Sequence, residues 1–178
     1  MAEHLLLVGT MGAGKSTVGR LVADRLGWVH VDTDHEVERR AGMSVSEVFA
    51  RRGEPAFRRL ESDVLAAVLR RPGPSVVSVG GGAVLDPDNR AALAAGGTVV
   101  WLRARPDTLA DRVGTGGDRP LLGGDVAGAG PALVRIDGER RPLYQAVADE
   151  VIDVDDLEPD AVAGLVLAAL GTPSERRP

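Results

Sequence analysis

The sequence predicts an α/β fold, with three α/β/α layers built around a central sheet of five parallel strands. Short apolar runs alternate with longer segments of helical periodicity along most of the chain. Glycine-rich or acidic turns follow three of the apolar runs, and the carboxyl ends of parallel strands are where such folds bind ligands. With 178 residues, we expect a single domain over residues 1–170 and a flexible tail over 171–178.

Three strands are expected in the first half of the chain. His4–Val8 is apolar and ends in glycine, as a buried parallel strand does. Residues 18–26 then have helical spacing, and Gly27 ends that helix. Trp28–Val31 and Ser75–Val79 are the second and third strands. The intervening segment, from Glu36 to about Arg71, has a charged helical pattern that is interrupted near residues 42–44 and 53–55.

The second half adds two strands and four helices. The strands are expected at Thr98–Leu102 and Val151–Val154. The helices are expected near Asp88–Ala95, after Pro106, at Ala132–Ala148 and at Asp160–Leu170. Residues 114–130 contain seven glycines and few large apolar side chains, so we expect a flexible lid there rather than a packed helix.

Composition excludes several classes of function. The chain has 44% hydrophobic and 26% charged residues, which is ordinary for a globular protein. It has no cysteine, which rules out disulfides, thiolate catalysis and cysteine zinc sites, and its three histidines lack metal-ligand spacing. A net charge of −5 argues against general nucleic-acid binding. No apolar run approaches the roughly 20 residues of a membrane span. We expect a cytoplasmic protein, and nothing in the sequence demands an oligomer, so a monomer is expected.

Residues 9–16 fit the phosphate-binding pattern G-x-x-x-x-G-K-[ST]. Glycines let successive backbone N–H groups point toward phosphate oxygens, and the following helix adds its positive end. The expected nucleotide-binding residues of this motif are Gly12, Ala13, Gly14, Lys15, Ser16 and Thr17. Lys15 would reach the β- and γ-phosphates of ATP, and the Ser16 hydroxyl would ligate Mg²⁺. The motif predicts nucleotide binding within a P-loop kinase fold.

Lys15 is also the only lysine among 21 basic residues, the other 20 being arginine. A chain that uses arginine for every other positive charge has kept lysine where a compact ammonium is required. This position argues against a chance match to the motif.

Asp32 and Asp34 follow the second strand, separated by one residue. One carboxylate can hold Mg²⁺ through water while the other accepts a hydrogen bond from an attacking hydroxyl group. The alternative is a solvated turn or a helix cap, both of which aspartate favours. The two residues alone do not decide between these interpretations.

Six motifs together resemble the shikimate kinase family, from about residue 4 to residue 170. They occur in the family's order: Gly9–Thr17 (G-x-x-G-x-G-K-S-T), Asp32–Asp34 (D-T-D), Gly53–Glu61 (G-E-x-x-F-R-x-x-E), Gly80–Gly82, Arg119–Leu122 (R-P-L-L) and Arg140–Tyr144 (R-x-P-L-Y). The first is shared by many unrelated nucleotide-binding proteins, whereas the other five are more specific together. The resemblance implies transfer of the ATP γ-phosphate to the 3-hydroxyl of shikimate, a small cyclohexene carboxylate, with Mg²⁺ as cofactor.

The resemblance also implies residue roles in a substrate-binding helical segment at about 33–61 and beyond it. Arg58 and Arg140 would clamp the substrate carboxylate, and Glu61 would orient Arg58 from one helical turn away. Asp34 would accept a hydrogen bond from the reacting hydroxyl, and Asp32 would hold a water of the Mg²⁺ shell. Three neighbouring glycines would let main chain approach the ring: Gly80, Gly81 and Gly82.

Two further arginines are expected at the nucleotide. Arg119 lies in the expected lid and would reach the phosphates on closure, so it is expected to be catalytic with Lys15 and Asp34. Arg112 matches a family arginine that packs against adenine. The chain departs from the family in its glycine-rich lid after Leu122, and in the absence of a basic residue at 155–158.

Two other interpretations remain open. One is a different small-metabolite P-loop kinase, acting on gluconate or on a nucleoside monophosphate. The other is a nucleotide-binding module that does not transfer phosphate, whose signature would be loss of Lys15, Asp34 or the lid arginine. The sequence retains all three.

Overall fold

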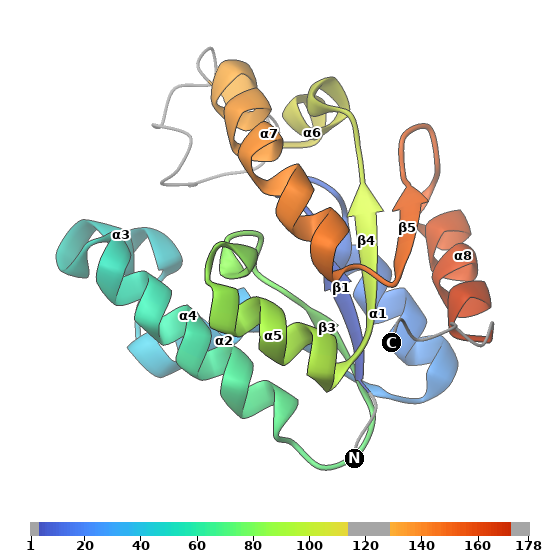
Figure 1. The fold of residues 1–178 in the computed structure, drawn as a ribbon, viewed down its shortest axis with the longest axis horizontal. Coiled ribbons are helices and arrows are strands. Elements are labelled where there is room, and N and C mark those ends of the chain that lie inside the picture. The colour runs from blue at the N-terminus through green and yellow to red at the C-terminus, as the bar shows by residue number, and fades with distance from the viewer. Residues whose placement is uncertain (1–3, 114–128, 172–178) are drawn as a thin grey trace.

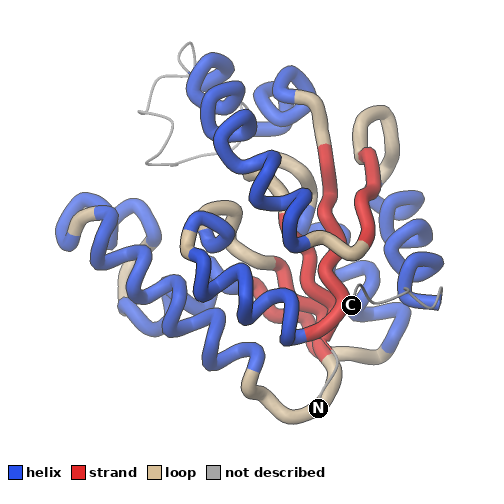
Figure 2. The backbone as a smooth tube through the Cα atoms, viewed as in Figure 1, coloured by secondary structure: helices blue, strands red, loops and turns tan. Residues whose placement is uncertain are grey.

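The computed structural model describes residues 4–113 and 129–171 of the chain. At its centre is a sheet of five parallel strands, drawn in red in Figure 2. The strands are β1 (His4–Val8), β2 (Val29–Asp32), β3 (Ser75–Ser78), β4 (Gly97–Arg103) and β5 (Glu150–Asp153). Their order is β2-β3-β1-β4-β5, which places the first strand in the middle of the sheet. Leu6 of β1 lies between Val77 of β3 and Val99 of β4.

Helices cover both faces of this sheet (Figure 1). They are α1 (Lys15–Leu26), α2 (Thr33–Ala41), α3 (Val45–Arg52), α4 (Glu54–Leu69), α5 (Pro87–Gly96), α6 (Pro106–Val113), α7 (Ala129–Val147) and α8 (Pro159–Gly171). A short 3₁₀ helix, η1 (Ala83–Leu85), follows β3. The predicted three-layer fold with a five-stranded parallel sheet is therefore confirmed.

Alternation along β1 divides the core into two clusters. Leu5 and Leu7 face one side, where they join residues of α1, α8 and the first part of α7. Leu6 and Val8 face the other side, where they join residues of α4, α5 and the end of α7. A strand that is buried on both faces reads as a continuous apolar run, which explains the His4–Val8 pattern. The first cluster's buried residues are all aliphatic, whereas the second also contains Phe57, Trp101 and Tyr144.

Element boundaries differ from the predicted ones by small amounts. The second strand was placed at Trp28–Val31, whereas β2 runs one residue later, and α2 begins at once at Thr33. The reason is local, because the Asp32 carboxylate caps α2 by accepting from the backbone N–H groups of Asp34 and His35. Asp32 is therefore the last residue of β2, and Asp34 lies in the first turn of α2.

Two expected loop segments were also too long. Ala129 and Gly130, which we placed in the lid at about 114–130, belong to α7, and Gly171 of the expected tail belongs to α8. Helix termini tolerate glycine better than helix interiors do. Gly130 and Gly171 are therefore accommodated at the ends of α7 and α8, and the predicted lengths of both loops were too large. The rest of the expected lid, residues 114–128, lies outside the described residues.

Across residues 4–113 and 129–171, no helix combines the length and the apolar character that crossing a membrane requires.

Candidate active site

The phosphate-binding pattern forms the loop between β1 and α1. Gly12 and Gly14 have φ angles of 88° and 89°, a left-handed backbone that glycine adopts without strain. A Cβ atom at Gly12 would also lie 3.0 Å from the Leu109 carbonyl oxygen. Helix α1 begins at Lys15 with no side-chain cap on its N-terminal N–H groups. Such a helix start presents N–H donors and the positive end of the helix dipole, which suits a phosphate.

Lys15 contacts this same loop. Its ammonium Nζ donates to the carbonyl oxygens of Gly9 at 2.7 Å and Thr10 at 3.2 Å. The ammonium group therefore lies against the carbonyl groups at the start of the phosphate loop.

Ser16 and Asp32 meet beside the phosphate loop. The Ser16 hydroxyl donates to Asp32 Oδ2 at 2.5 Å, while Asp32 Oδ1 caps α2. The cap and the hydroxyl contact use different oxygens, so the two interpretations of Asp32 are compatible. The pair offers hard oxygen donors of the kind that Mg²⁺ prefers.

A second group of charges lies around the end of β3. Arg58 Nη1 donates to Glu61 Oε2 at 2.8 Å, as the i, i+3 spacing predicted. Its Nε and Nη2 both donate to Glu54 Oε1, at 3.2 and 3.0 Å. A Cβ atom at Gly82 would lie only 1.9 Å from Arg58 Nη1. Gly82 thus leaves the space that the guanidinium occupies.

The other two glycines have equally specific neighbours. A Cβ atom at Gly80 would lie 2.7 Å from Asp34 Oδ1 and 2.8 Å from Glu61 Oε1. Two carboxylates therefore approach each other over this glycine. A Cβ atom at Gly81 would meet the Gly9 carbonyl oxygen at 3.2 Å and Arg140 Nη1 at 3.5 Å. The triple glycine accommodates side chains of the site itself, a reason that the sequence alone did not supply.

Burial perturbs one of these acids strongly. Glu61 is 2% exposed, and this burial raises the pKa of its carboxyl group to about 7, against the opposing effect of the Arg58 guanidinium. The nearby Asp34 carboxylate raises the Glu61 pKa further. The acid that holds Arg58 is thus one that titrates near neutral pH.

Arg140 comes from α7, whose final turns pack on the same face of the sheet as α4 and α5. It is buried, at 4% exposed, although it is a charged side chain. Tyr144, one turn later on α7, donates its hydroxyl proton to the Gly81 carbonyl oxygen at 2.6 Å. Burial raises the pKa of Tyr144 to about 12, so the phenol remains a donor. This bond holds α7 against the loop that follows β3.

Most of these groups line one cavity of about 810 Å³. Its nucleotide end is formed by residues 11–18, Arg112 and the segment after β5, and its acceptor end by residues of α2, α4, α7 and the β3 loop. Of the predicted site residues, the following line it: Gly12, Ala13, Gly14, Lys15, Ser16, Thr17, Asp32, Asp34, Arg58, Glu61, Gly81, Gly82, Arg112 and Arg140. Gly80 lies directly beneath Asp34 and Glu61. Arg119 lies outside the described residues.

The sequence reasoning missed several polar side chains that hold this site together. The Thr33 hydroxyl accepts from the Gly80 N–H at 2.8 Å. The Thr10 hydroxyl donates to the Asp137 carboxylate at 2.7 Å, across 127 residues of sequence. Thr33 stands inside a recognised motif and could have been found there. No local signal links Thr10 to Asp137.

The fold and the site define a P-loop nucleotide-binding protein of the kinase type, with a separate pocket of paired arginines and acids beside the phosphate loop. A family model described as shikimate kinase matches residues 11–171. A shikimate kinase from Moorella thermoacetica is 45% identical over 170 residues, covering 96% of this chain and 95% of the relative. The chain therefore belongs to the shikimate kinase family.

Solved structures agree with this family. A shikimate kinase from Acinetobacter baumannii, in complex with shikimate, superposes with a TM-score of 0.91 at 34% identity, covering 99% of this chain and 97% of that chain. A gluconokinase from Sinorhizobium meliloti 1021 reaches a TM-score of 0.61 at 19% identity, covering 97% and 94%. The second likeness shows a shared fold alone.

Proposed function

We propose that this chain transfers the γ-phosphate of ATP to the 3-hydroxyl of shikimate, giving shikimate 3-phosphate and ADP. The observation that carries the proposal is one cavity with a phosphate loop at one end and Asp34, Arg58 and Arg140 at the other. Two arginines suit a carboxylate, because guanidinium groups form paired hydrogen bonds with it. Among the reactions of P-loop kinases, the names of the relatives favour this one, because they are shikimate kinases.

The residues divide the reaction between them. Lys15 would exchange its loop carbonyl partners for phosphate oxygens, together with the N–H groups at the start of α1. Asp34 would accept a hydrogen bond from the attacking hydroxyl and fix its direction. Arg58 and Arg140 would hold the carboxylate and so the ring. A loose transition state needs positioning and charge stabilisation more than a strong base.

Mg²⁺ fits the site, because the Ser16 hydroxyl and the Asp32 carboxylate are oxygen donors in contact beside the phosphate loop. These two residues would hold it, Asp32 through water. When bound, the ion would offset negative charge on the phosphates. Arg119 is proposed to add a further positive charge there.

The cellular location and the oligomeric state belong to the same proposal. The reaction would take place in the cytoplasm, where its co-substrate ATP is available. The protein would act as a monomer, because every proposed site residue within the described part of the chain comes from one copy and lies in or directly beneath one cavity.

A coupled assay of ADP release tests the proposal. Purified protein with Mg²⁺ and ATP is compared with and without shikimate, with gluconate and nucleoside monophosphates as control acceptors. We expect release with shikimate alone, and a loss of at least about 100-fold in kcat for Asp34→Asn. ADP release with gluconate instead would reject shikimate as the acceptor. No ADP release with any acceptor would favour a module that binds nucleotide without transferring phosphate.

A further inference from the structure

Thr10 connects the two ends of the cavity through a buried hydrogen bond. Its carbonyl oxygen accepts from Lys15 Nζ at 3.2 Å and from the Ala13 N–H at 3.2 Å. Its hydroxyl donates to Asp137 Oδ1 of α7 at 2.7 Å. Thr10 and Asp137 are 2% and 3% exposed. A single residue of the phosphate loop therefore contacts both the lysine and the helix that carries Arg140.

Asp137 has a second partner on its own helix. Its Oδ2 accepts from Arg141 Nε at 2.5 Å, and Arg141 Nη2 donates to the Ala104 carbonyl oxygen at 2.7 Å. This buried carboxylate is thus satisfied on both oxygens, one toward the phosphate loop and one toward the end of β4. A buried carboxylate with fixed partners on both sides holds a defined position.

The turn of α7 between these contacts is intrinsically weak. Pro142 has no N–H to donate to the Gly138 carbonyl oxygen, and Gly138 is itself a poor helix former. Arg140 stands within this turn. Its position therefore depends on side-chain anchors around the turn, which are Asp137 to Thr10, Arg141 to Ala104, and Tyr144 to Gly81.

We propose that Asp137 is a positioning residue that, through its hydrogen bond with Thr10, couples the phosphate loop to Arg140 and so couples nucleotide binding to binding of the acceptor carboxylate. The inference rests on the proposed function, since Arg140 is assigned there to the carboxylate. Nucleotide phosphates that bind Lys15 and the loop would restrict the motion of Thr10. Through its hydrogen bond with Thr10, Asp137 would then restrict the motion of α7. The acceptor would then bind to an Arg140 that is already placed.

The test measures shikimate binding by isothermal titration calorimetry with Mg²⁺, in the absence and presence of saturating ADP. The ratio of the two dissociation constants is the coupling factor. Thr10→Val removes the hydroxyl with almost no change of shape, whereas Thr10→Ser keeps it. Asp137→Asn removes the charge and keeps one acceptor oxygen.

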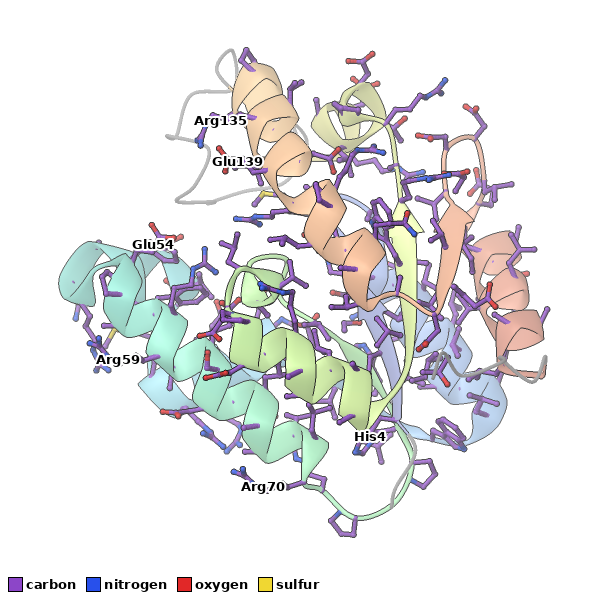
Figure 3. All side chains as sticks on the ribbon, in the orientation of Figure 1. His4, Glu54, Arg59, Arg70, Arg135 and Glu139 are labelled. Atoms are coloured by element: carbon purple, nitrogen blue, oxygen red, sulfur yellow. The ribbon has the colours of Figure 1, made fainter. Side chains whose placement is uncertain are left out.

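Glu139→Gln is the matched control. Glu139 lies on the outer side of α7, where Figure 3 labels it beside Arg135, and its carboxylate accepts from Arg135 at 3.2 Å in an exposed ion pair. The change from carboxylate to amide is the same as in Asp137→Asn, two residues away on the same helix. A general effect of altering charge on α7 would appear in both variants.

We expect ADP to tighten shikimate binding to the wild-type protein by about fivefold or more. Thr10→Val and Asp137→Asn should bring this factor close to one and raise the KM for shikimate by about tenfold, with a smaller change in kcat. Thr10→Ser and Glu139→Gln should retain the wild-type factor. Circular dichroism and thermal melts establish that each variant is folded, and Thr10→Val carries the test alone if Asp137→Asn does not fold.

The outcomes separate the two proposals. Absence of shikimate-dependent ADP release by the wild-type protein would reject the proposed function and this inference with it. An active wild-type protein whose coupling factor is one, or is unchanged by Thr10→Val, would overturn the inference alone. Loss of coupling in Glu139→Gln as well would also overturn it, because the effect would then not depend on the Thr10–Asp137 bond.

Discussion

At Glu61, burial and an ion pair act in opposite directions on one carboxyl group. Burial favours the neutral acid, whereas the Arg58 guanidinium at 2.8 Å favours the carboxylate. Burial dominates, and the pKa is raised from its ordinary value of 4.5 to about 7. The charge that holds Arg58 is therefore present above neutral pH and is progressively lost below it.

Because the folded-state pKa of Glu61 lies above the unfolded value, the folded protein binds more protons between about pH 4.5 and 7. This group's contribution to the free energy of unfolding therefore falls as pH rises through that window, by up to about 3 kcal/mol. We expect Glu61→Gln to remove this contribution. Denaturant unfolding of both proteins from pH 5 to 8 checks it. A wild-type-minus-variant difference that stays constant with pH would contradict it.

Gly82 gives a sharper test of the acceptor pocket. Alanine there would place its Cβ atom 1.9 Å from Arg58 Nη1, so the guanidinium must leave its present position. Because a charge-assisted hydrogen bond contributes about 1.5–3 kcal/mol, we expect the KM for shikimate to rise by about tenfold or more. The KM for ATP should stay within about twofold. Equal loss of both affinities would mean that Gly82 serves the fold rather than Arg58.

At the scale of elements, periodicity and turn residues predicted all five strands and the main helices. The buried strands could be found because both faces are apolar, and the phosphate loop because its glycines and lysine follow a strict spacing. What periodicity could not supply was the contact between distant elements. Thr10 and Asp137 are 127 residues apart, and their pairing arises only when α7 packs beside the phosphate loop.

Most of the site could also be predicted, because its residues fall in short motifs at the ends of neighbouring strands. The physical reason for the glycine run could not. A Cβ atom at any of the three glycines would meet a carboxylate, a guanidinium or a carbonyl group contributed by another element. Such crowding depends on tertiary packing, which the local sequence of Gly80–Gly82 does not encode.

Gly97, at the start of β4, tests the packing of elements in the sheet. A Cβ atom there would lie 1.9 Å from the His4 carbonyl oxygen, a backbone group that cannot swing aside. We expect Gly97→Ala to lower the free energy of unfolding by about 3 kcal/mol or more. His4 is labelled in Figure 3 near the N-terminus, at the end of β1 away from the phosphate loop. We therefore expect the substitution to lower stability more than it lowers activity. Denaturant melts measure it.

Gly164→Ala is the matched substitution on another element. Gly164 is inside α8, and within residues 4–113 and 129–171 no atom beyond its chain neighbours and the local helix backbone lies within 4 Å of where its Cβ would stand. Alanine is a better helix former than glycine by about 1 kcal/mol, so this variant should be more stable than the wild type. A destabilised Gly164→Ala protein would show that glycine substitution is harmful here for reasons other than crowding.

For the molecule as a whole, a ligand at either end of the cavity should stabilise the folded protein. A ligand at about 100 times its dissociation constant stabilises the folded state by about 2.7 kcal/mol. The melting temperature should therefore rise by several degrees with Mg²⁺-ADP and again with shikimate. We expect Arg58→Ala to keep the shift with Mg²⁺-ADP and to lose the shift with shikimate. Loss of both would contradict the assignment of Arg58 to the acceptor.

The chain path from β2 to β3 has a consequence for how such proteins diversify. Helices α2, α3 and α4 leave the sheet at β2 and return to the adjacent strand β3, at one edge of the sheet. The phosphate loop comes from the central strand and is made by a separate stretch of chain. Recombination or design could therefore exchange the residues between the two strands as one cassette. A descendant that also changed Arg140 and the glycine run after β3 could in this way acquire a new acceptor while inheriting its phosphate donor unchanged.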